Sequence, residues 1–235
     1  MRKAKIYPSS AAWALGKMIY TDTPQGCLRY ILLQRYIPKF IDIDPKFKEI
    51  GNWGEEQYLD YMLNEQDYPF HRELPFKSEL NGIQVSGRMD FISYHDGFKV
   101  IHECKTTQSK NVLYQNMRKN EPKLNHMAQL VFYLINQNET RGKLVYRFWP
   151  TNELKIFKIE IEPSGQILVD KKPYKLTVNE QMTHQILSAE VLTEEYIADK
   201  PYGSGCRFCD YKEECEKFDS VGGSHIDDFM EVINV

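Results

Sequence analysis

The sequence of 235 residues lacks the features that would place it in a membrane or mark it for export. Its mean hydropathy is -0.54, and no apolar run approaches the length that crosses a bilayer. The first residues, Met1 to Lys5, are basic, but the apolar segment of a signal peptide does not follow them. We therefore expect a cytoplasmic protein.

The sequence also lacks an excess of basic charge. It has 30 Lys and Arg against 33 Asp and Glu, which gives a formal net charge of -3. Any surface that binds DNA must therefore be a local basic patch. One candidate is the stretch 105–125, which holds five basic residues and a single acid, Glu121. This stretch is either a solvated charged loop or a loop that contacts phosphates.

Cysteine is scarce, with five residues in the whole chain. In a chain with no export signal, cysteines are metal ligands or thiols more often than disulfides. Cys206, Cys209 and Cys215 form a C-x₂-C-x₅-C cluster, which is one thiolate short of a four-cysteine site. Cys27 is the candidate fourth ligand. Zinc and an iron–sulfur cluster both accept four thiolates, and the spacing alone does not decide between them.

The length suits a single domain, and two turn signals organise its centre. Asn81-Gly82 and Asp96-Gly97 each separate half-apolar runs, which is typical of two-residue hairpin turns. They predict a three-strand antiparallel meander over residues 70–105. Two more strands are expected over 143–149 and 154–161. Helices are expected over 9–20, 26–36, 122–137 with Pro122 in its first turn, 175–198, and a segment that opens at 51–56.

The hairpin of residues 87–105 gathers charged side chains. With a turn at Asp96-Gly97, opposed residue numbers sum to 193, so that Asp90 faces Glu103 and Arg88 faces Lys105. The period of two along a strand adds Lys105 to the face of Glu103. Two opposed carboxylates about 5 Å apart repel each other unless a cation lies between them, and a divalent metal is the obvious candidate. A solvated polar face is the alternative.

Three helical side chains could complete such a site. Glu55 is either a third carboxylate ligand or, with Asn52 as N-cap, part of a capping box. Gln129 and Tyr133 lie four residues apart and so share one helix face. They could hold a catalytic lysine or a strand backbone, although Tyr133 alone would pass for a residue at the edge of the core.

These motifs resemble the PD-(D/E)xK nuclease superfamily, and within it the RecB-type branch. The resemblance rests on Gly51 with Glu55, Gly87-Arg-Met-Asp90, Glu103-Cys-Lys105 and Gln129-Leu-Val-Phe-Tyr133. It implies an α/β core, in which a mixed sheet of about five strands is flanked by helices. One departure is that Glu55 stands where many relatives have His, but an oxygen ligand still suits Mg²⁺ or Mn²⁺.

The resemblance also implies the chemistry of the site, which is metal-assisted hydrolysis of a phosphodiester. Glu55, Asp90, Glu103 and the carbonyl of Cys104 would hold Mg²⁺ or Mn²⁺. Lys105 would orient or deprotonate the attacking water, with Gln129 and Tyr133 as its helical support. The side chain of Cys104 points to the opposite strand face and is expected to be a small buried hydrophobe.

The lone Cys27 followed by C-x₂-C-x₅-C is similar to the iron–sulfur members of the RecB-type nucleases, including the CRISPR-associated RecB-like exonucleases and their phage homologues. The similarity implies a structural [4Fe–4S] cluster on Cys27, Cys206, Cys209 and Cys215, within one nuclease domain over 1–219 followed by a flexible tail over 220–235. It also implies an exonuclease that acts on single-stranded DNA or DNA ends, with 5′-to-3′ polarity.

The alternatives are a DNA-end binding or adaptor protein of a CRISPR-adaptation or recombination complex, and a zinc-stapled structural protein. Protein partners and an oligomer are compatible with each of these readings.

Overall fold

The computed structural model describes residues 5–6, 33, 37, 44–65, 69–183, 185, 209 and 211–221. The chain divides into two compact units, and Ile41–Phe76 with Gly87–Gln181 form the one that carries every predicted site residue except the four cysteines. The helices expected over 9–20 and 26–36 lie outside the described residues, apart from the helical and buried Leu33. No helix in the described part is long and apolar enough to span a membrane.

Eight strands of the described residues form one mixed sheet, which is wider than the five or so expected. Its order is β1-β3-β4-β5-β6-β7-β8, and β2 pairs with β3 outside this path. The β1–β3 and β4–β5 pairs are parallel, whereas the other neighbours along this order are antiparallel. The strands are β1 (Lys5–Ile6), β2 (Phe70–Leu80), β3 (Ile83–His95), β4 (Phe98–Thr107), β5 (Arg141–Phe148), β6 (Glu153–Ile161), β7 (Gln166–Val169) and β8 (Lys172–Thr177).

The hairpin turns have the backbone that their sequences predict. Asn81 and Gly82 have φ of 48° and 79°, and Asp96 and Gly97 have φ of 49° and 79°. Positive φ at both central residues is the type I′ geometry, which matches the twist of the flanking strands. The expected β2–β3–β4 meander is therefore confirmed.

The last two strands of the sheet were not expected, and the prediction of helix for residues 175–177 is wrong. β7 and β8 are joined through Asp170 and Lys171, which both have positive φ although neither is a glycine. The usual Asn-Gly or Asp-Gly signal is absent from this turn, so the hairpin could not be recognised. Helical backbone begins only at residue 178 and is described for 178–183 and 185.

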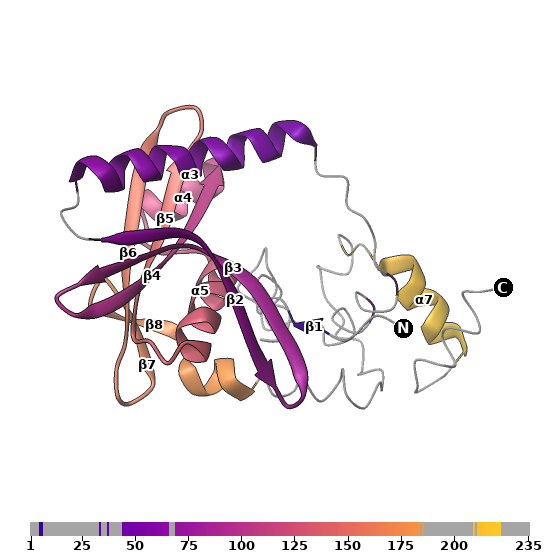
Figure 1. Cartoon of the computed structure of the whole chain (residues 1–235). Coiled ribbons are helices and arrows are strands. Elements are labelled where there is room, and N and C mark those ends of the chain that lie inside the picture. The colour runs from indigo at the N-terminus through magenta and orange to yellow at the C-terminus, as the bar shows by residue number, and fades with distance from the viewer. Residues whose placement is uncertain are drawn as a thin grey trace. The chain divides into compact units, whose positions relative to one another are not determined.

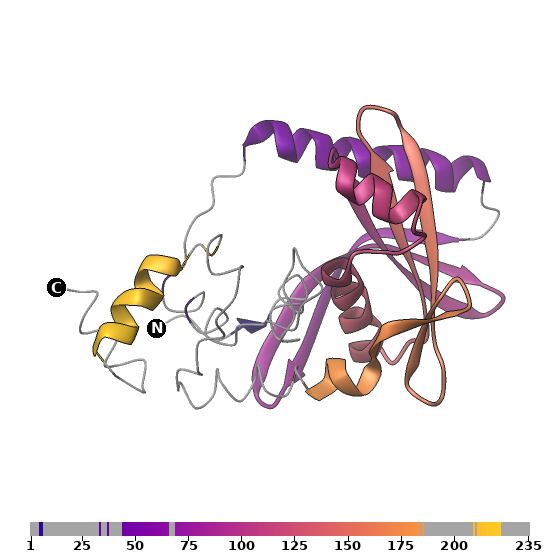
Figure 2. The same ribbon diagram turned by 180° about the vertical axis from the view of Figure 1, so that it is seen from behind.

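Two helices cover opposite sides of the β4–β5 pair (Figures 1 and 2). They are α3 (Pro45–Glu65) and α5 (Leu124–Asn136), and both contact β4 and β5. On the α3 side, Tyr58 and Met62 pack against Val145 of β5 in a fully buried cluster. Contacts with β4 on these two sides place α3 and α5 beside the strand that carries Glu103 and Lys105.

Helix α3 begins six residues earlier than expected. Asp44 precedes it, and the Oδ1 atom of Asp44 accepts a hydrogen bond of 2.9 Å from the N–H of Lys46, while Pro45 occupies the first helical position. Asn52 and Glu55 therefore lie in the helix interior, where backbone N–H groups already have helical partners. The capping-box interpretation of Glu55 is wrong.

The basic stretch 105–125 is not a plain loop, because it contains helix α4 (Lys110–Met117). Ser109 is its N-cap and accepts the N–H of Val112 through its hydroxyl oxygen. Helix α5 then starts at Leu124 with Lys123 as N-cap, so Pro122 precedes the helix and does not lie in its first turn. Helix α7 (Lys212–Val221) belongs to the other unit and includes two residues that were expected in the flexible tail.

Candidate active site

Strands β3 and β4 separate just before the predicted carboxylate pair. Their paired residues run from His95 opposite Phe98 to Phe91 opposite His102, and each pair sums to 193 as expected. Asp90 and Glu103 are the next positions, but the ladder no longer includes them. Instead, Oδ2 of Asp90 accepts a hydrogen bond of 2.7 Å from the backbone N–H of Cys104. The side chain of Asp90 thus occupies the gap where a backbone partner would lie.

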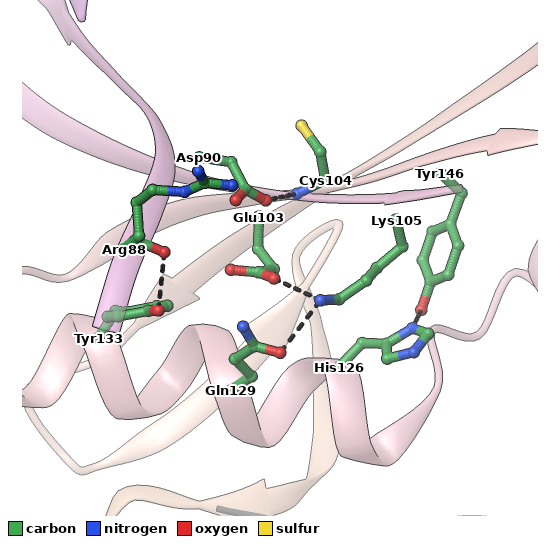
Figure 3. A network of polar contacts seen from close by, with 9 residues as sticks. All are labelled: Arg88, Asp90, Glu103, Cys104, Lys105, His126, Gln129, Tyr133 and Tyr146. Carbon is green, nitrogen blue, oxygen red and sulfur yellow. Dashed lines mark hydrogen bonds and ion pairs between the residues drawn. The ribbon is translucent and has the colours of Figure 1, made fainter. Parts of the chain in front are cut away.

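Glu103, Lys105 and Gln129 meet on the α5 side of the sheet (Figure 3). The Nζ atom of Lys105 donates hydrogen bonds to Oε1 of Glu103 at 2.5 Å and to Oε1 of Gln129 at 3.0 Å. Glu103 is only 1% exposed, whereas Lys105 is half-buried. The ammonium group is therefore held between a strand carboxylate and a helix amide.

One oxygen of Glu103 has no hydrogen-bond partner among the residues that the structure describes. Its Oε2 atom is buried and accepts no hydrogen bond from them. Leaving a charged oxygen buried without a partner is costly, so this atom fits the donor set of a hard divalent cation. Across the described residues, however, no group of three or more His, Cys, Asp or Glu side chains is arranged to hold a metal ion as it stands. Glu55, Asp90 and Glu103 interact electrostatically but do not converge on one point.

The electrostatics of the site show crowding of negative charge. Burial, and then the charge of Glu103, raise the pKa of Asp90 to about 7. Burial also raises the pKa of Glu103, against the lowering effect of Lys105. For Lys105, burial lowers the pKa, but Glu103 and Asp90 outweigh it and the pKa is raised. A bound cation would relieve this repulsion between carboxylates.

Glu55 approaches the same site from α3. Burial and the charge of Asp90 raise its pKa, and its Oε2 atom lies 3.7 Å from Nη2 of Arg72 on β2. The other amino group of Arg72 binds the exposed Glu56 at 2.7 Å. Glu55 therefore faces the carboxylates while Glu56 lies at the surface, as expected.

The helix α5 supports both strands of the hairpin. Gln129 binds Lys105, and the hydroxyl of Tyr133 donates a hydrogen bond of 2.9 Å to the carbonyl oxygen of Arg88. The shared helix face thus holds the lysine and a strand backbone together, as its spacing predicts. The side chain of Arg88 does not face Lys105, because it is exposed and pairs with Glu73 at 3.0 Å. The expected pairing of Arg88 with Lys105 is wrong, because β3 and β4 are no longer paired at this point.

Cys104 has the position expected from the strand period. Its side chain points away from Glu103 and packs against the cluster of Tyr58, Met62, Phe91 and Val145. Burial raises the pKa of its thiol well above the usual range, so it stays protonated.

A buried histidine beside the site was missed. His102 is fully buried, and its Nδ1 and Nε2 atoms lie 2.9 Å from the Tyr58 hydroxyl and 2.8 Å from the Ser93 hydroxyl. Burial keeps its pKa well below the ordinary value, so the ring is neutral. These contacts tie α3, β3 and β4 together next to Glu103. The available signal was a histidine within an otherwise apolar strand face.

The cysteine cluster is only partly described. Cys209 is half-buried and Cys215 is buried on α7, and the N–H of Lys212 donates to the carbonyl of Cys209 at 3.2 Å. Cys27 and Cys206 lie outside the described residues.

Three solved structures share this fold. LHK-Exo, an alkaline exonuclease from Laribacter hongkongensis, is 14% identical over 83% of this chain and 90% of its own, with a TM-score of 0.56. The structure of LHK-Exo in complex with dAMP is 12% identical over 82% of this chain and 89% of its own, with a TM-score of 0.58. A phage related exonuclease from Haemophilus somnus 129PT is 14% identical over 83% of this chain and 97% of its own, with a TM-score of 0.53. A search of curated proteins found no significant match.

None of these similarities concerns an iron–sulfur cluster or a CRISPR-associated branch. The sequence itself matches the family model over residues 47–216, a range that includes the carboxylates, Lys105 and α5. The sheet and helices are arranged as in the solved exonucleases. The family match shows that the chain belongs to the PD-(D/E)XK nuclease superfamily.

Proposed function

We propose that this protein is a metal-dependent deoxyribonuclease that removes nucleotides from single strands or DNA ends. The observation that carries the proposal is the unpartnered, buried Oε2 atom of Glu103, which lies beside a lysine held by Glu103 and Gln129. A structural carboxylate would have this oxygen satisfied by the protein, whereas a ligand for a cation would not. The fold shared with two exonucleases supports the exonuclease reading.

The residues that would hold Mg²⁺ or Mn²⁺ are Glu55, Asp90, Glu103 and the carbonyl of Cys104. Such a cation supplies Lewis acidity and lowers the pKa of bound water. Lys105 is positioned to orient the water and to stabilise negative charge on the phosphate, because its raised pKa keeps it protonated beside the carboxylates. Gln129 fixes the lysine, and Tyr133 fixes the strand that carries Asp90.

The test is digestion of end-labelled single- and double-stranded DNA with Mg²⁺ or Mn²⁺, and with EDTA as the control. We expect metal-dependent release of mononucleotides, since LHK-Exo has been crystallised with the mononucleotide dAMP. The resemblance of the motifs to the RecB-type exonucleases favours release from the 5′ end. If the nucleotide labelled at the 3′ end is released first, the polarity is the opposite of the one proposed. Retention of intact DNA with tight binding under all metals would instead favour an end-binding adaptor protein.

We also propose a structural [4Fe–4S] cluster on Cys27, Cys206, Cys209 and Cys215. Its support is the cysteine spacing, together with the burial of Cys215 and the placement of Cys209 just before α7. Protein purified without oxygen should contain iron and labile sulfide, and Cys215→Ser should lose both. Zinc without iron would replace this proposal with a zinc site.

A further inference from the structure

A pocket of about 370 Å³ lies between the first two turns of α3 and the end of β4. Ligand sites in proteins span roughly 300–1,000 Å³, so it is large enough for a small planar ligand. Phe47, Ile50 and Gly51 line it from the helix, and residues 106–109 line it from the strand end. Thr106 directly follows Lys105, so the pocket begins where the proposed catalytic strand ends.

Gly51 has no role that the packing of the described residues explains. A Cβ atom built on it would meet nothing within 4 Å, so the glycine leaves open space at the pocket wall. Glycine inside a helix is unfavourable by roughly 0.5–1 kcal/mol relative to alanine. Gly54, one turn later, differs, because its Cβ would lie 1.8 Å from the Thr106 hydroxyl oxygen. The bare backbone at Gly51 is therefore suited to the close approach of a ligand.

The pocket presents both an apolar ring and polar groups. Phe47 is 62% exposed, which leaves a large aromatic side chain at the pocket without cover from the described residues. Gln108 is exposed opposite it and offers an amide donor and acceptor. Trp149 donates its backbone N–H to the carbonyl of the pocket residue Thr107 at 3.0 Å, and its ring lies 4.8 Å from that of Trp53.

Charged residues adjoin the pocket-lining residues in the sequence. Lys46 and Lys48 flank Phe47, and Lys110 follows Ser109; all three are exposed, alongside the acids Asp44 and Glu49. A flat ring, an amide and nearby ammonium groups match a nucleobase attached to a phosphate backbone, since bases stack on aromatic side chains while lysines follow the phosphates.

We propose that this pocket binds a nucleobase of single-stranded DNA, from a nucleotide neighbouring the scissile phosphate, with Phe47 as its stacking partner. The inference rests on the proposed nuclease function and names part of its substrate site. It favours unpaired DNA, because a base within a duplex cannot enter a side pocket without leaving its stack.

The experiment measures binding of a short fluorescent single-stranded oligonucleotide to the full chain, with Ca²⁺ in place of Mg²⁺ to limit cleavage. Phe47→Ala should weaken binding about tenfold, the range expected for loss of one stacked base. Phe47→Trp should retain binding. Gly51→Leu should fill the pocket and weaken binding similarly while raising thermal stability, because leucine favours helix more than glycine does.

The matched control is Leu63→Ala. Leu63 lies on the same helix with the same exposed fraction, 62%, but does not line the pocket, so its replacement should leave binding unchanged. An oligonucleotide with one abasic position, moved along the strand, adds an independent readout. Wild type should lose affinity at one position, and Phe47→Ala should lose nothing further there.

The outcomes separate the two proposals. If wild type cleaves DNA but Phe47→Ala and Gly51→Leu bind as Leu63→Ala does, the pocket inference is overturned and the nuclease stands. If wild type does not cleave but its binding depends on a base at one position and on Phe47, the pocket stands and the nuclease proposal fails.

Discussion

The backbone N–H of Cys104 donates a hydrogen bond of 2.7 Å to the carboxylate of Asp90, one position beyond the last paired residues of β3 and β4. The side chain of Asp90 therefore takes the place of a backbone acceptor and is fixed beside Glu103. This arrangement holds two repelling carboxylates close together, because one of them is anchored to the strand that carries the other.

The anchored carboxylate makes the stability of the metal-free protein depend on pH. The pKa of Asp90 is raised from 3.8 to about 7, so the folded state keeps a proton that the unfolded chain has already lost in this range. The free energy of unfolding should therefore fall as pH rises from about 4 to about 7. For Asp90 alone, three pKa units at 1.36 kcal/mol each set an upper bound of about 4 kcal/mol on this change.

Urea unfolding in EDTA between about pH 5 and pH 8 measures this dependence. Asp90→Asn should make the curve less steep, and by more than Asp96→Asn does, the matched change in the exposed turn of the same hairpin. Mg²⁺ or Mn²⁺ should stabilise the wild type more at the high end of the range, because metal binding competes with protons. Stability that rises with pH in EDTA would contradict the prediction.

Lys105→Ala should remove catalysis while DNA still binds. The ammonium group is held by Glu103 and Gln129 and is aimed at the proposed metal site, so its loss removes stabilisation of charge in the transition state. We expect a loss of about a hundred- to a thousandfold in cleavage rate, as for removal of one donor to a developing anion. The cleavage rate on end-labelled DNA tests the loss of catalysis, and fluorescence anisotropy tests whether the variant still binds DNA.

Lys99→Ala is the control for that variant. Lys99 lies on the same strand, but its Nζ atom donates to Oε1 of Gln137 at 2.9 Å and pairs with Glu139 at 3.5 Å, so its partners differ from those of Lys105. It should cleave as wild type does. If Lys105→Ala cleaves DNA as fast as wild type does, the assignment of Lys105 to the active site is wrong.

The sequence predicts the central hairpin because its signals are local. Asp96-Gly97 fixes the turn and thus the register, and the strand period then places Lys105 beside Glu103 and turns Cys104 away. The four-residue spacing of Gln129 and Tyr133 likewise fixes which helix face meets the strands. Each of these inferences needs only a short stretch of chain and one geometric rule.

The features that escaped prediction depend on tertiary contacts or on unusual turns. The β3–β4 pairing ends before Asp90, and Arg88 pairs with Glu73 of β2 instead, which no local pattern in the sequence encodes. The β7–β8 turn uses Asp170 and Lys171 where glycine is usual. The start of α3 is different, since Asp44-Pro45 is a recognisable signal that Gly51 and Asn52 obscured.

The buried histidine predicts a coupling between stability and metal binding. Tyr58→Phe removes the hydroxyl 2.9 Å from Nδ1 of His102 and leaves a buried ring nitrogen without a partner. We expect a loss of about 1–3 kcal/mol in the free energy of unfolding. Tyr58 lies one turn beyond Glu55 on α3, so the variant should also weaken Mn²⁺ binding. Tyr61→Phe, at the half-buried ring stacked on Tyr58, should do neither.

The two glycines of α3 predict opposite effects of one substitution. A methyl group on Gly54 would lie 1.8 Å from the hydroxyl oxygen of Thr106, so Gly54→Ala should push the helix from β4 and destabilise the protein by about 1–3 kcal/mol. A methyl group on Gly51 meets nothing within 4 Å, so Gly51→Ala should stabilise it by up to about 1 kcal/mol through helix propensity.

Urea unfolding of Gly51→Ala and Gly54→Ala tests this prediction. Both variants replace glycine by alanine in the same helix and gain the same helix propensity, so they differ only in the contact with Thr106. Thr106→Ala removes the hydroxyl and the methyl that a Gly54 side chain would meet, so the double variant should recover part of the loss. Gly54→Ala should also lower the cleavage rate, since the displaced helix carries Glu55 away from Asp90. Equal effects of the two alanines on stability would show that α3 is not held against β4 through Gly54, and the position of Glu55 would then need another cause.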